Sequence, residues 1–307
     1  MSDGKWTAPE MYSFAETELG KIHYRLQGPV SAPLCVCCHG FGDFLYNWAP
    51  FAAYLVNSGY QVLTFDLFGR GYSDCPEGDQ DSDYFAHQIE LLLKSIGKFD
   101  QKIGLIGHSM GGAIVMRYAD IYPDAVNWLV LVAPAGLLSL TLVKFVRCCS
   151  LLRNLMISQQ LTPENARKMW NKLMYQPDTH PELLDMIARY QLYQLEHNQN
   201  LRRAITSTVL HFPLGGAESL ASIKRVGQHK RPVLFLWGKD DEIVPFNLYE
   251  QFATIFPQAQ LVSFDKCGHI PMHEHQDKFH TEVVKFIGEH SPIAIPVEAN
   301  EIGEEVN

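Results

Sequence analysis

The chain has 307 residues, of which 47% are hydrophobic and 19% charged, enough to bury the core of one large α/β domain or two small ones. Its net charge of −9 argues against a nucleic-acid binder, since no basic surface is available to release counterions from phosphates. Residues 1–6 lack the apolar core of a signal peptide, and no uncharged apolar run reaches the roughly 18 residues of a spanning helix. We therefore expect a cytoplasmic protein.

Strand-like and helix-like segments alternate along the first half of the chain. The expected strands are 21–26, 34–38, 61–65, 102–106 and 128–132, and the expected helices are 48–57, 82–96 and 110–122. From Leu34 onward the strands are near-continuous apolar runs, typical of a parallel sheet covered by helices on both faces. The alternation resumes with strands 233–237 and 261–264 and helices 245–256 and 277–289.

Three of the seven cysteines, Cys35, Cys37 and Cys38, fall within one expected strand. Successive strand residues face opposite sides of a sheet, so Cys35 and Cys38 cannot together hold a metal despite their Cys-x-x-Cys spacing. We expect buried, reduced thiols.

The interval 136–226 interrupts this alternation with helical patterning and few strand-like runs. The simplest organisation is a discontinuous core, 1–135 and 227–290, with a helical insertion at 136–226. The tail 291–307 contains four glutamates and no basic residue, and we expect it to be disordered.

A single serine stands where the apolar run 102–106 meets a helix-like run. Residues 107–111 read GHSMG, the Gly-x-Ser-x-Gly pattern of a nucleophile elbow, a tight turn from strand to helix. The turn requires residues nearly free of side chain two positions away, which are Gly107 and Gly111. The Ser109 hydroxyl then stands clear at the strand end, and the Met110 N–H, at a helix N-terminus, can face an oxyanion.

A serine hydroxyl is a weak nucleophile at neutral pH and needs a base, which in turn needs an orienting carboxylate. On an elbow the expected chain order is serine, acid, histidine. The turn 238–245 contains Asp240 and Asp241, and the turn 266–271 contains His269. Both turns follow the carboxyl ends of expected strands, as Ser109 does, and sites in open parallel sheets form at that edge.

Five motifs together resemble the α/β-hydrolase family over roughly residues 15–135 and 228–290. They are HGFG at 39–42, DLFGRGYS at 66–73, GHSMGG at 107–112, WGKDDEIVP at 237–245 and GH at 268–269. The resemblance implies an α/β-hydrolase fold, with a mostly parallel central sheet flanked by helices. The interval 136–226 is similar to the family's helical cap in position and pattern.

The resemblance also implies the roles of the site residues. Ser109 would be the nucleophile, His269 the general base and then acid, and Asp241, three residues after Gly238, the acid of the triad. The backbone N–H groups of Phe41 and Met110 would form the oxyanion hole. No metal or organic cofactor is required.

Neighbouring polar residues have alternative interpretations. Asp240 is the alternative acid. His108 is interpreted as a packed elbow residue, and His39 as a hydrogen-bonding residue that shapes the oxyanion loop. Asp66 and Arg70 are expected to hold the turn 69–73 together.

Two further groups lie close to the motifs. His273 and His275 flank Glu274, but no further ligand pattern accompanies them, so we do not expect a metal site. Asp43, Tyr46 and Trp48 follow the oxyanion loop and either line the pocket or have a structural role.

Serine at the elbow favours acyl chemistry, because the haloalkane dehalogenases and epoxide hydrolases of the family that this sequence resembles place aspartate there. We expect a serine hydrolase acting on a hydrophobic or lipid-like carboxylic ester, a small-molecule acyl substrate. The apolar run 136–156, which carries three basic residues, is interpreted as a cap helix that roofs an acyl pocket or makes peripheral membrane contact. A helix buried on its own domain is the alternative.

Other activities stay open beside the esterase. They are a carbon–carbon hydrolase of the meta-cleavage type, a thioesterase, and a catalytically silent ligand-binding member of the fold. Pocket shape separates these activities, and the motifs do not reveal it. The oligomeric state is also left open.

Overall fold

The computed structural model describes residues 13–138 and 196–291, and between them residues 157, 162, 165, 168, 171–179, 181–182, 184–185, 189 and 194. Part of the predicted insertion and nearly all of the acidic tail lie outside the described residues. The apolar run predicted as a cap helix falls there from residue 139 onward, so its proposed membrane contact stays a prediction. No helix of the described part is long and apolar enough to cross a membrane.

The described residues form an eight-stranded sheet in the order β1-β2-β4-β3-β5-β6-β7-β8. β1 and β2 are antiparallel at one edge, and the remaining strands run parallel to one another. The strands are β1 Ser13–Glu16, β2 Lys21–Gln27, β3 Leu34–Cys38, β4 Gln61–Phe65, β5 Ile103–His108, β6 Val126–Val132, β7 Val233–Gly238 and β8 Gln260–Phe264. The predicted fold class, a mostly parallel sheet flanked by helices, is confirmed.

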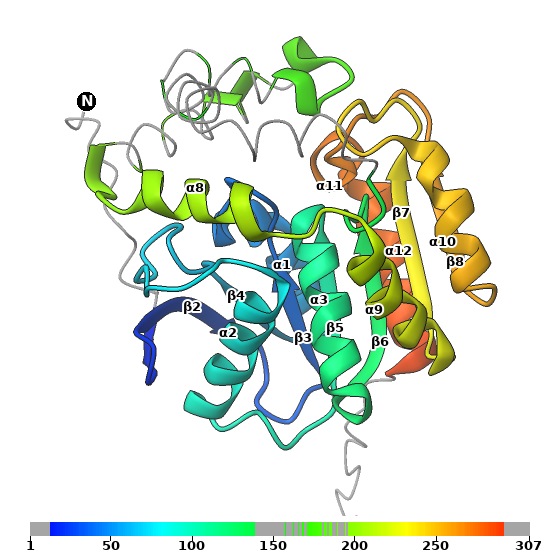
Figure 1. Cartoon of the computed structure of the whole chain (residues 1–307). Helices are drawn as coiled ribbons and strands as arrows, with labels where there is room; N and C mark the ends of the chain where they lie inside the picture. Colours follow the sequence, from blue (N-terminus) through cyan, green and yellow to red (C-terminus); the bar gives the residue numbers. More distant parts are fainter. Residues whose placement is uncertain are drawn as a thin grey trace, which may run out of the picture.

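Helices cover both faces of this sheet (Figure 1). One face carries α2 Ser82–Ser95, α3 Met110–Ile121, α9 Ala217–Gln228 and α10 Tyr249–Ile255, and the other carries α1 Ala49–Asn57, α11 Pro271–Glu274 and α12 Gln276–His290. The described chain also contains α8 Leu201–His211 and the short 3-10 helices η1 Leu45–Trp48, η2 Pro123–Ala125, η3 Pro177–Thr179 and η4 Phe246–Leu248.

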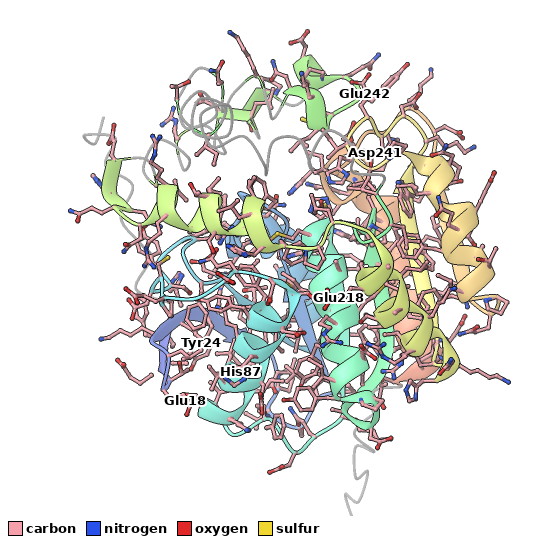
Figure 2. All side chains as sticks on the ribbon, in the orientation of Figure 1. Glu18, Tyr24, His87, Glu218, Asp241 and Glu242 are labelled. Atoms are coloured by element: carbon pink, nitrogen blue, oxygen red, sulfur yellow. The ribbon has the colours of Figure 1, made fainter. Side chains whose placement is uncertain are left out.

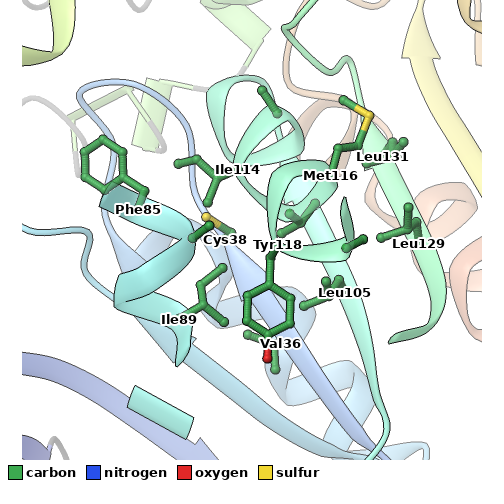
Figure 3. Packing of buried hydrophobic residues seen from close by; sticks show 14 of the residues in the cluster. Val36, Cys38, Phe85, Ile89, Leu105, Ile114, Met116, Tyr118, Leu129 and Leu131 are labelled. Carbon is green, nitrogen blue, oxygen red and sulfur yellow. The ribbon is translucent and has the colours of Figure 1, made fainter. Parts of the chain in front are cut away.

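The alternation of side chains along the strands divides the core in two. On β3, Val36 and Cys38 pack with α2 and α3, whereas Cys35 and Cys37 pack with α1 and α12. Figure 3 shows the first of these clusters, with Ile114 of α3 close to Cys38. The three cysteines are free and fully buried, as predicted, and burial raises the pKa of each thiol.

The helix α9 crosses the boundary predicted at residue 226. Its Ile223 and Val226 are buried in the same cluster as α3. The chain therefore returns to the core before residue 226, because the apolar side of α9 packs against the sheet layer.

The helix α8 is held to the core by the loop that follows β4. Arg70, buried in that loop, donates from Nη1 to the Phe68 carbonyl (2.9 Å) and to Gln80 (2.6 Å), and from Nη2 to Thr208 of α8 (2.6 Å). Burial lowers the pKa of Arg70 to about 10. Arg70 was expected to hold the turn 69–73. Asp66, predicted to hold the turn together with Arg70, accepts from the Tyr72 N–H at 3.0 Å, whereas the Arg70 guanidinium extends to α8.

Gly104 of β5 leaves no room for a side chain, because an added Cβ would overlap the indole of its strand partner Trp128. We expect Gly104→Ala to lower the free energy of unfolding by about 1–3 kcal/mol through overpacking. Gly288→Ala is the matched control: its Cβ meets only Tyr60 Oη at 3.7 Å, and the helix α12 should gain about 0.5–1 kcal/mol. Urea denaturation of both variants checks this, and equal stabilities would contradict it.

Candidate active site

Ser109 lies between β5 and α3 with a strained backbone, at φ 54° and ψ −119°. Its N–H donates to the Val132 carbonyl of β6 at 2.9 Å. Its own carbonyl accepts from the N–H groups of Gly112 (3.0 Å) and Ala135 (2.9 Å). A non-glycine residue in such a conformation costs about 1–3 kcal/mol and persists only where its surroundings fix it. The neighbouring strand and helix fix it here.

The two glycines of the pentapeptide are required by contacts within the turn. A Cβ on Gly107 would lie 2.5 Å from the Gly111 carbonyl oxygen. A Cβ on Gly111 would overlap the carbonyl oxygens of Cys38 and His39 at the end of β3. The predicted need for small residues on both sides of Ser109 is confirmed.

The loop 39–42 lies directly against this turn. A Cβ on Gly40 would be 3.2 Å from His108 Nδ1 and 3.3 Å from Ser109 Cβ. The loop therefore brings Phe41, next to Gly40, close to the turn, and Met110 is the first residue of α3, where N–H groups have no intrahelical acceptor. These are the two residues predicted to supply oxyanion-hole N–H groups.

His39 holds this loop in place. Its Nδ1–H donates to the Gly40 carbonyl at 2.9 Å, and its Nε2 accepts from the Leu67 N–H at 3.0 Å. Burial lowers the pKa of His39 to about 4, so the ring is neutral at pH 7 and keeps this tautomer. The interpretation of His39 as a residue that shapes the loop agrees with this geometry.

The structure brings Asp241 and His269 together. His269 Nδ1 lies 2.7 Å from Asp241 Oδ2, and both side chains are buried. Asp241 Oδ1 accepts from the N–H groups of Ile243 (2.8 Å) and Val244 (2.9 Å), which fix the carboxylate. The alternative acid, Asp240, is exposed. Figure 2 shows Asp241 and its exposed neighbour Glu242 in the loop after β7.

His108 joins the loop of His269 to the elbow. Its Nε2–H donates to the His269 carbonyl at 2.9 Å, and the two ring centroids are 4.7 Å apart. Burial and the neighbouring His269 ring lower the pKa of His108 well below its usual range, so His108 stays neutral. Within the described residues no hydrogen bond joins the Ser109 hydroxyl to His269, and such contacts are often long before substrate binds.

A buried polar chain connects the oxyanion loop with α11. Asp43 accepts from the Phe44 N–H at 2.8 Å and from the Asn47 amide, and the Asn47 amide oxygen contacts His273 Nε2. The sequence spacing does not indicate this series of polar contacts, because 226 residues separate Asn47 from His273. His275 faces a different partner, the Lys266 carbonyl, at 3.3 Å.

Burial raises the pKa of Asp43 to about 7, far above that of an unfolded aspartate, near 3.9. The folded protein then binds this proton more tightly than the unfolded chain, so stability falls as pH rises from about 4 to 7 and levels off above. We expect Asp43→Asn to remove a decline of about 1 kcal/mol per pH unit in this window. Exposed Asp100→Asn should leave the decline intact. Parallel stability curves for Asp43→Asn and wild type would contradict this.

Comparison with known proteins identifies the family. A model of the alpha/beta hydrolase fold matches residues 33–276. A 2-hydroxy-6-oxononadienedioate/2-hydroxy-6-oxononatrienedioate hydrolase of Paraburkholderia phymatum is 31% identical over 281 residues, covering 89% of this chain and 92% of the relative. Lipase 1 of Psychrobacter immobilis is 30% identical over 259 residues, covering 84% and 78%.

Solved structures share the architecture. A meta-cleavage product hydrolase from Pseudomonas fluorescens IP01 superposes with a TM-score of 0.73 at 21% identity, covering 92% of this chain and 99% of that one. An esterase from Exiguobacterium antarcticum superposes with a TM-score of 0.74 at 19% identity, covering 90% and 99%. The family match, the sheet order and the strained serine turn agree, and the chain belongs to the α/β-hydrolase fold family.

Proposed function

We propose that this chain is a serine hydrolase that cleaves a hydrophobic carboxylic ester through an acyl-enzyme. The observation that carries the proposal is the buried Asp241–His269 pair beside the strained turn at Ser109. Asp241 accepts the Nδ1 proton of His269, which leaves Nε2 as the basic atom of the ring. The Ile243 and Val244 N–H groups hold Asp241 in the orientation that this requires.

The proposed reaction has two halves. His269 Nε2 takes the hydroxyl proton as Ser109 Oγ attacks the ester carbonyl, and the N–H groups of Phe41 and Met110 stabilise the oxyanion. The tetrahedral intermediate collapses, and His269 returns the proton to the departing alcohol. Water, deprotonated by His269, then attacks the acyl-enzyme, and His269 returns this proton to Ser109 Oγ as the acid is released.

A carbon–carbon hydrolase is the second candidate, and the names of several relatives favour it. Relatives between 27% and 31% identical are named as dienedioate hydrolases, beside lipases at 29% and 30%. The same nucleophile and base can act on a ketone, but the carbon leaving group must then be protonated. A dioate substrate also needs cationic partners, whereas a lipid-like ester needs an apolar pocket, so the substrate distinguishes the two candidates.

The first test combines active-site labelling with substrate choice. We expect a fluorophosphonate probe to label the wild type and not Ser109→Ala, because only the activated hydroxyl attacks phosphorus. Among p-nitrophenyl esters from acetate to palmitate, longer acyl chains should react faster. Faster turnover of a 2-hydroxy-6-oxodienoate than of any ester would favour the second candidate. A folded wild type that is neither labelled nor active on either substrate class would contradict both.

The second test compares the two adjacent aspartates. Asp241→Asn should lower kcat by about 10⁴-fold, because an amide in place of the carboxylate stabilises the wrong tautomer of His269. Asp240→Asn is the matched control and should stay within about threefold of wild type, because its side chain is exposed. Steady-state kinetics of both variants on the preferred substrate measure this difference. A larger loss of kcat in Asp240→Asn than in Asp241→Asn would make Asp240 the acid.

A further inference from the structure

The segment 171–179, within the interval predicted as a cap, is bonded to the loop that carries His269. The His269 N–H donates to the Leu173 carbonyl at 2.7 Å. Glu274 joins the same two pieces of chain, because its Oε1 accepts from the Gly268 N–H at 2.8 Å and its Oε2 accepts from the Tyr175 N–H at 2.7 Å. The Leu173 carbonyl thus connects the segment directly to His269, and the Glu274 carboxylate connects it to Gly268.

Packing around these hydrogen bonds is tight. A Cβ on Gly268 would lie 2.5 Å from the Leu173 carbonyl oxygen and 3.0 Å from the Tyr175 nitrogen, so only glycine allows the close approach. Met174, between them, is buried in the core cluster that also contains Cys267 and Ile270. The segment 171–179 therefore packs directly against the loop that carries His269.

Glu274 is held mainly by backbone donors. Burial raises the pKa of Glu274, while the Tyr175 and Gly268 N–H groups favour its charged form. In the described part of the chain, no lysine or arginine forms an ion pair with it. The carboxylate thus serves as a two-oxygen bridge between two N–H groups, a role for which a side chain with a single acceptor oxygen is insufficient.

Besides its contacts to the segment 171–179 and to the His269 loop, α11 also contacts the chain that follows the oxyanion loop. His273, next to Glu274, reaches Asn47 and through it Asp43, as described above. A displacement of α11 would therefore disturb both the base and the oxyanion loop. The four residues of α11 are the point at which the His269 loop, the oxyanion loop and the segment 171–179 meet.

We propose that Glu274 is a positioning residue that couples the segment 171–179 to His269, so that the imidazole is held against the elbow only while this segment is docked. The inference rests on the proposed function, because it assigns His269 as the base. Release of the segment would leave the His269 N–H without its acceptor and Glu274 Oε2 without its donor, and would free the loop to shift. A shift of about 1 Å at a reacting group costs about a hundredfold in rate.

Glu274→Gln tests the bridge without changing its length, because glutamine has one acceptor oxygen and places an NH₂ group against the second N–H. We expect the first-order rate constant of fluorophosphonate labelling to fall about ten- to a hundredfold, with the probe's KI within threefold of wild type. Amide hydrogen exchange should rise in peptides covering 171–176 and 267–270 and stay unchanged elsewhere. Glu289→Gln, an exposed glutamate of α12, is the control and should alter neither measurement.

A second pair of variants tests the bridge from the other side. Tyr175→Pro removes the N–H that Glu274 accepts, whereas Tyr175→Ala keeps it. Proline should reproduce the slow labelling and alanine should not. This pair also decides the question if Glu274→Gln fails to fold.

Two outcomes would overturn the inference alone: unchanged exchange in both peptides, or raised exchange with normal labelling per folded molecule. The latter would leave Glu274 a structural residue without influence on His269. A folded wild type that is neither labelled nor active on either substrate class would instead overturn the proposed function, while the exchange measurements would still report whether Glu274 holds the segment.

Discussion

The strained turn at Ser109 is the constraint on which the rest of the site depends. A serine at positive φ is stable only where its neighbours fix both its peptide groups, and here β6 and the first turn of α3 do so. The same turn brings Gly111 so close to the end of β3 that the chain leaving β3 must pass directly over it. The oxyanion loop therefore packs directly on the elbow, and a shift of one would displace the other.

Buried polar groups then connect the loops at this edge of the sheet. A buried polar atom without a partner is costly, so each such group fixes the chain that supplies its partner. His39 ties the oxyanion loop to the end of β4, and His108 ties the elbow to the His269 loop. The contact between Asn47 and His273 connects the chain after the oxyanion loop with α11, which follows the His269 loop. These contacts fix the loops of the candidate site before a substrate binds, and such prior ordering is the basis of electrostatic preorganisation.

Much of the fold could be predicted from the chain because its signals are local. The buried parallel strands are continuous apolar runs, and each was predicted to within two residues of its observed ends. The largest differences are at the end of β5 and the start of β6, two residues each. The edge strand β1 was missed, because it has only four residues and three of them are exposed, so no hydrophobic pattern marks it. The residues of the candidate triad were also found locally, since each follows a strand end in a recognisable turn.

The sequence by itself determined the class of fold, the serine turn and the chain order of Ser109, Asp241 and His269, because glycine spacing and apolar periodicity are short-range properties. The spacing from Gly238 already indicated Asp241 rather than Asp240, and the structure places Asp241 beside His269. Only the tertiary structure decided that Arg70 reaches α8. Only the tertiary structure showed the bridge from Glu274 to Tyr175, whose partners are 99 residues apart. The donor there is a backbone N–H, which every residue except proline carries, so no pattern of side chains indicates it.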